Sequence, residues 1–281
     1  MENQRLFARK PHAVHVKQKE MTMQKPLTIL ILTILCVPML AARADIIWQG
    51  DDGNDLNTGS NWAGDAIPGG SDEAHFDDTA SNYTPNASDD FHVARFEIQS
   101  DTPYMITASA GKTIRAIYGG ASLNIGNSAG DTNTAVNHSI VADLIVSDQI
   151  LTRNNLASGS AVQIGDDSTT LYLSNPAGSS DNTVSLYPET GSSMTITSAV
   201  VDGGGVGGLL MGFYDEGTVT FDGAQANTYT GDTTIRGGDL VLNKSGAGTN
   251  SAVIGDIYIG ATHGSARTAA LRLADNDQVG D

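Results

Sequence analysis

Closely spaced carboxylates are the first feature of this sequence that could bind a ligand. Residues 51–55 read DDGND, with the carboxylate density of a calcium loop but neither the D-x-[DN]-x-[DN]-G register nor the distal bidentate Glu. Asp and Asn side chains also bond to local backbone in tight turns. We therefore expect a solvated turn here, and calcium binding by surface Asp turns stays open.

A glycine-rich stretch is the second such feature. Residues 203–208 read GGGVGG, without the Lys-Ser/Thr pair that completes a phosphate-binding loop, and Leu209 stands where a calcium-binding nonapeptide has Asp. We interpret this stretch as a flexible turn.

The histidines show no metal-binding spacing. They form no i,i+4 pair, so we expect exposed loop positions for those beyond the first 44 residues. These are His75, His92, His138 and His263. The sequence thus predicts no catalytic, cofactor-binding or metal-ligating residue.

An export signal is the clearest local pattern. A short basic start ending at Lys25 precedes an apolar run over residues 27–40, and small residues stand at the −3 and −1 positions of a cut after Ala44. A transmembrane anchor is the alternative, but about 14 residues falls short of the ~20 that a spanning helix needs, and Pro38 would disturb it. We expect the general secretion machinery to recognise residues 1–44 and cleavage to leave Asp45 first.

Removal of this signal leaves a strongly acidic chain. It takes away seven of the 15 Lys and Arg and two of the 32 Asp and Glu, so 8 basic residues face 30 acidic ones and the net charge becomes −22. Such a charge repels phosphate backbones and anionic lipid, which excludes nucleic-acid binding. The only cysteine, Cys36, leaves with the signal, so no disulfide can form in the mature chain.

The remaining sequence predicts an all-β fold. It has 32 Gly in the whole chain and many short apolar runs with period-two alternation, which indicates brief strands joined by tight turns. Apolar anchors recur at gaps of 19 to 25 residues, at Ile125, Ile145, Ile164, Leu186, Leu210, Ile235 and Ile257. This period favours a β-solenoid but leaves a β-sandwich open. In a solenoid coil, we expect alternate residues of the strands to point inward, namely Met194, Ile196, Val219, Phe221, Leu240, Leu242, Ile257 and Ile259.

A sequence motif that resembles a known repeat favours the β-solenoid over the β-sandwich. Residues 227–243 read NTYTGDTTIRGGDLVLN, and this stretch resembles the autotransporter-associated β-strand repeat (passenger-associated transport repeat) of bacterial secreted proteins. The matching residues are Asn227, Tyr229, Thr230, Gly231, Thr233, Thr234, Ile235, Gly237, Gly238 and Leu240. The resemblance implies a right-handed parallel β-helix that is exported and displayed at the cell surface.

Two tryptophans stand before the predicted coils. Trp48 and Trp62, with residues 67–76, resemble the opening segment that precedes the repeats in this family. Exposed rings could stack on sugars; alternatively, two residues that bury large areas could close the open end of the solenoid. We favour an N-terminal cap.

The domain organisation follows from these assignments. Residues 1–44 are the N-terminal extension and signal peptide, residues 45–110 the cap segment, and residues 111–281 the solenoid repeats, with the best match at 203–243. Because the family pattern leads to another strand after residue 281, we expect a longer protein.

Two functions remain open. The first is a secreted or surface-displayed, adhesin-like scaffold without catalytic activity and without a membrane span in the mature chain, with an unknown glycan or protein ligand. The alternative is a carbohydrate-active β-helix enzyme, a polysaccharide lyase or glycoside hydrolase, which needs convergent Asp or Glu on neighbouring coils.

The signal-peptide prediction can be tested directly. Protein recovered from its host should begin at Asp45, because the small residues that end at Ala44 are what the signal peptidase selects. N-terminal sequencing or intact mass measures this. Mature protein that still contains residues 27–40 would contradict the prediction.

Overall fold

The computed structural model describes ten stretches of the chain. These are residues 44–117, 121–128, 134–147, 149–152, 156–174, 181–212, 217–245, 251–260, 268–275 and 278–279. All of them belong to one compact unit, Arg43–Asp281. The predicted signal sequence before Ala44, with Cys36, and also His263 lie outside the described residues.

Alternating side chains form the strands of this unit. In β20 (Gly238–Leu242), Leu240 and Leu242 are buried while Asp239 and Val241 are partly exposed. The same alternation appears in β15 (Ser193–Ile196) and β18 (Thr218–Phe221). Because side chains of a strand point to opposite faces in turn, one face of each strand is apolar and must be covered.

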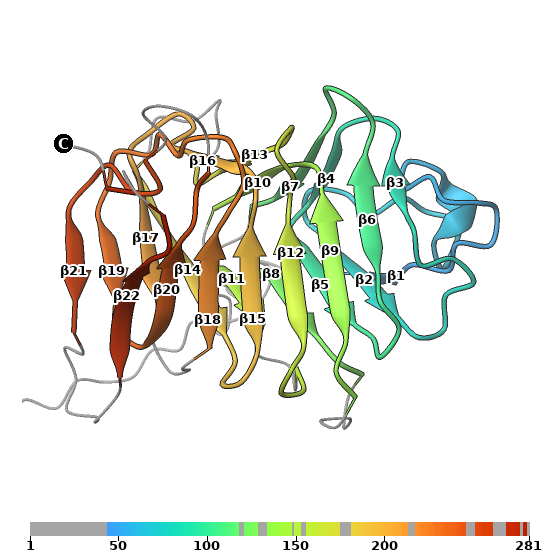
Figure 1. Ribbon diagram of the computed structural model, residues 1–281. Coiled ribbons are helices and arrows are strands. Elements are labelled where there is room, and N and C mark those ends of the chain that lie inside the picture. Colours follow the sequence, from blue (N-terminus) through green and yellow to red (C-terminus); the bar gives the residue numbers. More distant parts are fainter. Residues whose placement is uncertain are drawn as a thin grey trace, which may run out of the picture. The chain divides into compact units, whose positions relative to one another are not determined.

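The strands assemble into three sheets, which Figure 1 shows in sequence colours. The nine-stranded sheet contains β1 (Asp45–Ile47), β2 (Glu73–Asp77), β5 (Arg95–Gln99), β8 (Ala121–Gly126), β11 (Gln149–Thr152), β14 (Asn182–Pro188), β17 (Gly207–Met211), β19 (Thr233–Ile235) and β21 (Ile257–Ile259). The eight-stranded sheet contains β3 (Asn86–Ala87), β6 (Met105–Ala108), β9 (Asn137–Val141), β12 (Ala161–Ile164), β15, β18, β20 and β22 (Ala269–Leu273). The five-stranded sheet contains β4 (Phe91–Val93), β7 (Thr113–Ala116), β10 (Asp143–Val146), β13 (Thr170–Tyr172) and β16 (Ala199–Val201).

The order of the strands shows a coiling chain. From β2 to β16 the chain visits the nine-, the eight- and the five-stranded sheet in turn, and each strand pairs in parallel with its counterpart in the next coil. The only helical element among the described residues is the short 3-10 turn η1 (Gly59–Asn61). The expected all-β, parallel solenoid is therefore confirmed.

The core consists of columns of inward side chains. Val162, Met194, Val219 and Leu240 are in register on four successive strands, and each is at most 1% exposed. Burying each such side chain contributes about 1.5–3 kcal/mol. The inward positions expected for Met194, Ile196, Val219, Phe221, Leu240 and Leu242 agree with this arrangement.

The last coil departs from that expectation. Ile257 and Ile259 were predicted to point into a dry core, but Ile257 is only partly buried and Ile259 is 53% exposed. Their strand, β21, ends its sheet among the described residues, so no further strand covers them.

Unequal coils explain why the expected anchors do not form one series. Leu209, Thr233 and Ile257 stand in register at intervals of 24 residues, whereas Ile150 pairs with Leu186, 36 residues later. The anchor Ile145 belongs to the five-stranded sheet and Ile164 to the eight-stranded one. The anchor period therefore mixes positions on different sides of the coil.

The solenoid begins early in the chain. The nine-stranded sheet already contains β1, which pairs with β2, and β2 pairs with β5. Residues 45–110 thus contribute strands to all three sheets, and no change of architecture marks residue 110.

Candidate functional site

The repeat motif stabilises a corner of the coil. The five-stranded sheet ends at β16, and beyond it residues 227–229 continue that side of the solenoid without a strand of their own. Asn227 is fully buried there: its Oδ1 accepts the Val200 N–H at 2.9 Å and its Nδ2 donates to the Ala252 carbonyl at 2.7 Å. One side chain thus joins three successive coils.

The other motif residues serve close packing. Tyr229 is fully buried, and its hydroxyl is 2.7 Å from Thr233 Oγ1. A Cβ at Gly231 would approach the Gly207 carbonyl oxygen to 2.4 Å, so only glycine permits this contact between coils. Gly238 has a φ of +75° where the chain turns into β20.

Two motif positions differ from these because they face outward. Thr234 is partly exposed on β19, and Thr230 donates from its backbone and its hydroxyl to the Asp202 carboxylate at 2.9 and 2.8 Å. Ile235 follows Thr234 on β19, points to the opposite face of the strand and is fully buried.

The glycine-rich stretch is a turn only in part. Residues 203–206 form the bend between β16 and β17, whereas Gly207 and Gly208 are buried and form the start of β17. Gly207 packs so closely on Leu173 that an added Cβ would lie 2.8 Å from the Leu173 Cβ. The absence of side chains here serves contact between coils.

The two tryptophans lie inside an aromatic cluster. Both are fully buried, their ring centroids are 5.2 Å apart at 75°, and Trp62 stacks on Phe91 at 5.7 Å. Trp48 Nε1 donates to the Asn82 carbonyl and Trp62 Nε1 to the Leu56 carbonyl, each at 2.8 Å. Neither ring can stack on a sugar, which excludes the platform interpretation.

The aspartates of residues 51–55 form a turn, as expected. Asp55 accepts the Asn57 N–H at 3.0 Å and the Ser88 hydroxyl at 2.8 Å. Partial burial opposes ionisation, but these hydrogen bonds hold the pKa of Asp55 below its ordinary value. Within the described part of the chain, no three His, Cys, Asp or Glu residues are grouped as a metal would require.

The three described histidines occupy strands instead of loops, which corrects the expectation for them. His138 on β9 is 1% exposed, and its Nδ1 accepts the Tyr104 N–H at 3.2 Å. Burial lowers the pKa of His138 to about 4, so the ring is neutral. His75 lies on β2, 3.2 Å from Asp45, and His92 lies exposed on β4.

A buried lysine is a feature that the sequence analysis missed. Lys244 is 1% exposed, and its Nζ donates to the Ser198 carbonyl at 2.9 Å and the Thr197 carbonyl at 3.3 Å. Burial lowers the pKa of Lys244 to about 8. Lys244 follows the end of the alternating strand β20, so the strand pattern does not predict that its side chain points inward.

Stacking also creates a carboxylate pair. Glu73 on β2 and Glu97 on β5 both bind the guanidinium of Arg95, at 3.3 and 3.1 Å, and the two carboxyl groups are hydrogen-bonded to each other. Burial and the contact with Glu97 raise the pKa of Glu73 to about 7. Burial also opposes ionisation of Glu97, but the hydrogen bond from Glu73 and the charge of Arg95 lower its pKa.

The geometry of this pair differs from that of a glycosidase. Retaining and inverting enzymes hold their carboxyl groups about 5–9.5 Å apart with the sugar between them. Glu73 and Glu97 instead contact each other, and Asn124 donates to Glu97 at 3.0 Å. The cluster is a self-contained ion network with its charges paired.

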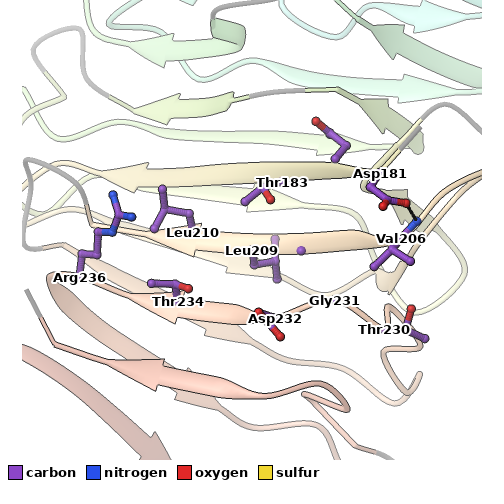
Figure 2. Close-up of a pocket in the computed structure, with 12 residues that line it drawn as sticks. Asp181, Thr183, Val206, Leu209, Leu210, Thr230, Gly231, Asp232, Thr234 and Arg236 are labelled. Atoms are coloured by element: carbon purple, nitrogen blue, oxygen red, sulfur yellow. Dashed lines mark hydrogen bonds between the residues drawn. The ribbon is translucent and has the colours of Figure 1, made fainter. Parts of the chain in front are cut away.

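A groove crosses the outer face of the nine-stranded sheet at β14, β17 and β19. Its volume is about 650 Å³, within the range of ligand sites. Figure 2 shows Thr183, Leu210 and Thr234 on three adjacent strands, Arg236 at one end, and Asp181 at the other. Asp181 accepts the Val206 N–H at 2.9 Å, which holds that end in place.

The fold and these sites define a parallel β-solenoid with an outer groove and a paired carboxylate cluster. No family model, no curated protein and no solved structure matches the chain. Among the described residues, no helix has the length and apolar character needed to cross a membrane.

The role of Asn227 yields a stability prediction. Asn227→Ala should lower the free energy of unfolding by about 2–4 kcal/mol, because the Val200 N–H and the Ala252 carbonyl would be left buried without partners. Urea unfolding measures this. Asn137→Ala is the control, since Asn137 also accepts a backbone N–H, from Ala161, but at an exposed site that water can reach. Equal losses in both variants would contradict the assignment.

The carboxylate pair predicts a pH dependence. The pKa of Glu73 is raised from 4.5 to about 7, so its contribution to stability is complete below pH 4.5 and is lost as the pH rises through 7. Glu73→Gln cannot ionise, so thermal melts should show it gaining stability relative to wild type between those values. Asp65→Asn, at an exposed carboxylate, should follow wild type. A Glu73→Gln profile parallel to wild type would contradict this coupling.

Proposed function

We propose that this protein is an exported, non-catalytic β-solenoid scaffold displayed at the bacterial cell surface, with an adhesin-like, passenger-like role. The observation that carries the proposal is that residues of the motif at 227–243 make contacts between coils. Asn227 and Gly231 hold successive coils together, and the buried Tyr229 hydroxyl is hydrogen-bonded to Thr233 within its own coil. A chain that repeats such contacts extends its outer surface with each coil, which suits display.

The start of the chain supports the same proposal. Cleavage after Ala44 would leave Asp45, the first residue of β1, at the new N-terminus. We propose that Trp48 and Trp62 belong to the cap of the solenoid, because both are fully buried in an aromatic cluster with Phe76 of β2 and Phe91 of β4. We also propose that the coil is right-handed, as parallel β-crossovers almost always are.

Its charge also favours a role outside the cell. The mature chain would carry a net charge of −22, which keeps it soluble and limits self-association through repulsion. Several of its acidic side chains accept hydrogen bonds from backbone amides, as Asp202 does from Thr230.

The enzyme alternative is the function that this proposal must exclude. Incubated with neutral and acidic polysaccharides, the full chain should release no hydrolysis or lyase products, because Glu73 and Glu97 contact each other and Arg95 and leave no room for a sugar between them. Reducing-end assays and ultraviolet detection of unsaturated products measure this.

Two results would contradict the proposal. Reproducible cleavage that disappears in Glu97→Gln would assign the protein as an enzyme. Protease shaving of intact cells should remove the protein, so full protection from an external protease would contradict surface display.

A further inference from the structure

The outer groove is made by residues that stacking brings into register. Thr183 pairs with Gly208, and Gly208 lies against Asp232, the residue before β19, because Leu209 pairs with Thr233. A second row contains Leu210, Thr234 and Tyr258. Gly208 has no side chain, so the sheet is hollowed between Thr183 and Asp232, and the groove follows from that gap.

The lining matches the chemistry of a sugar. Threonine hydroxyls, the Asp232 carboxylate and the Arg236 guanidinium supply donors and acceptors for hydroxyl groups, as Figure 2 shows. Leu210 is an apolar residue of the floor, and Tyr258, in register with Thr234, is 52% exposed. An aromatic ring and an aliphatic patch beside polar groups suit the two-sided character of a pyranose.

The strand spacing fits a polymer of such units. Neighbouring strands are about 4.8 Å apart, which is close to the length of one hexose unit. A chain lying across β14, β17 and β19 would therefore meet one set of outward side chains per sugar.

The charge of the groove selects among glycans. Asp181 and Asp232 line it, and Asp256 lies beside Asp232: both carboxylates raise the pKa of Tyr258 through their charge. Arg236 is the one basic residue among the groove-lining residues. Uronic acids and sulfated sugars would be repelled, whereas carboxylates accept hydrogen bonds from neutral hydroxyls.

A peptide fits this surface less well. Strand addition needs an unpaired sheet edge, but β14, β17 and β19 each have parallel partners on both sides. The large apolar residues of the lining are Val206, Leu209 and Leu210, and Leu209 is only 2% exposed, which leaves little apolar surface for a peptide anchor.

We propose that the outer face of β14, β17 and β19 binds a neutral oligosaccharide, seated over Gly208 and Leu210 and held by Asp232, Thr234 and Arg236. The inference rests on the proposed scaffold function and specifies the ligand of that surface. It requires binding without cleavage.

The test uses isothermal calorimetry with the full chain. Cello-, xylo-, laminari- and malto-oligosaccharides are the neutral probes, and oligogalacturonate is the acidic probe. At least one neutral probe should bind. Thr234→Trp should abolish that binding by filling the groove, and Asp232→Asn should weaken it about tenfold.

A matched variant controls for the substitution. Thr220→Trp places the same ring on an outward, partly exposed threonine of β18 in the eight-stranded sheet, and should leave binding unchanged. Thermal melts verify that each variant is folded. If Thr234→Trp does not fold, Asp232→Asn remains as the variant that tests the groove.

Several outcomes would overturn the inference. These are no binding of any neutral probe, binding of oligogalacturonate alone, or equal affinity in wild type and the groove variants. Retention of reduced casein, used as an unfolded polypeptide, that is lost in Thr234→Trp would assign the groove to peptides instead. Cleavage of a bound neutral probe would refute the scaffold function while leaving the binding site in place.

Discussion

The parallel ladder between successive coils is the interaction on which the whole structure depends. A strand at a sheet edge has unpaired N–H and C=O groups, and a strand with one apolar face needs cover. Each coil here satisfies both needs for its neighbours, as in the column from Val162 to Leu240. No coil is stable alone, so stability accumulates with stacking and is weakest at the ends.

The two ends of the described unit differ in how the core of the terminal coil is covered. At the start, Trp48 and Trp62 are fully buried in an aromatic cluster, and their ring N–H groups donate to backbone carbonyls. At β21, Ile259 is 53% exposed and nothing described covers it. Where the third sheet stops, Asn227 replaces the missing ladder with side-chain hydrogen bonds. Buried polar residues thus appear where regular pairing fails.

Function in such an architecture belongs to the outward rows. The inward side chains of each strand pack in the core. The side chains available for binding are therefore the outward ones that alternate with them, such as Thr234 beside Ile235. Stacking at a constant spacing places these side chains in rows without any local sequence signal. The Glu73, Arg95 and Glu97 cluster and the groove over Gly208 are two products of the same geometry.

The sequence by itself determined the strands, because period-two alternation and glycine turns act within a few residues of one another. It also indicated the coil through the motif at residues 227–243. Only the tertiary structure decided which strands stack, since one coil takes 24 residues, as from Thr233 to Ile257, and another 36, as from Ile150 to Leu186. Loop length sets that register, and local pattern does not encode it. The carboxylate pair, the inward Lys244 and the groove were therefore beyond sequence reasoning.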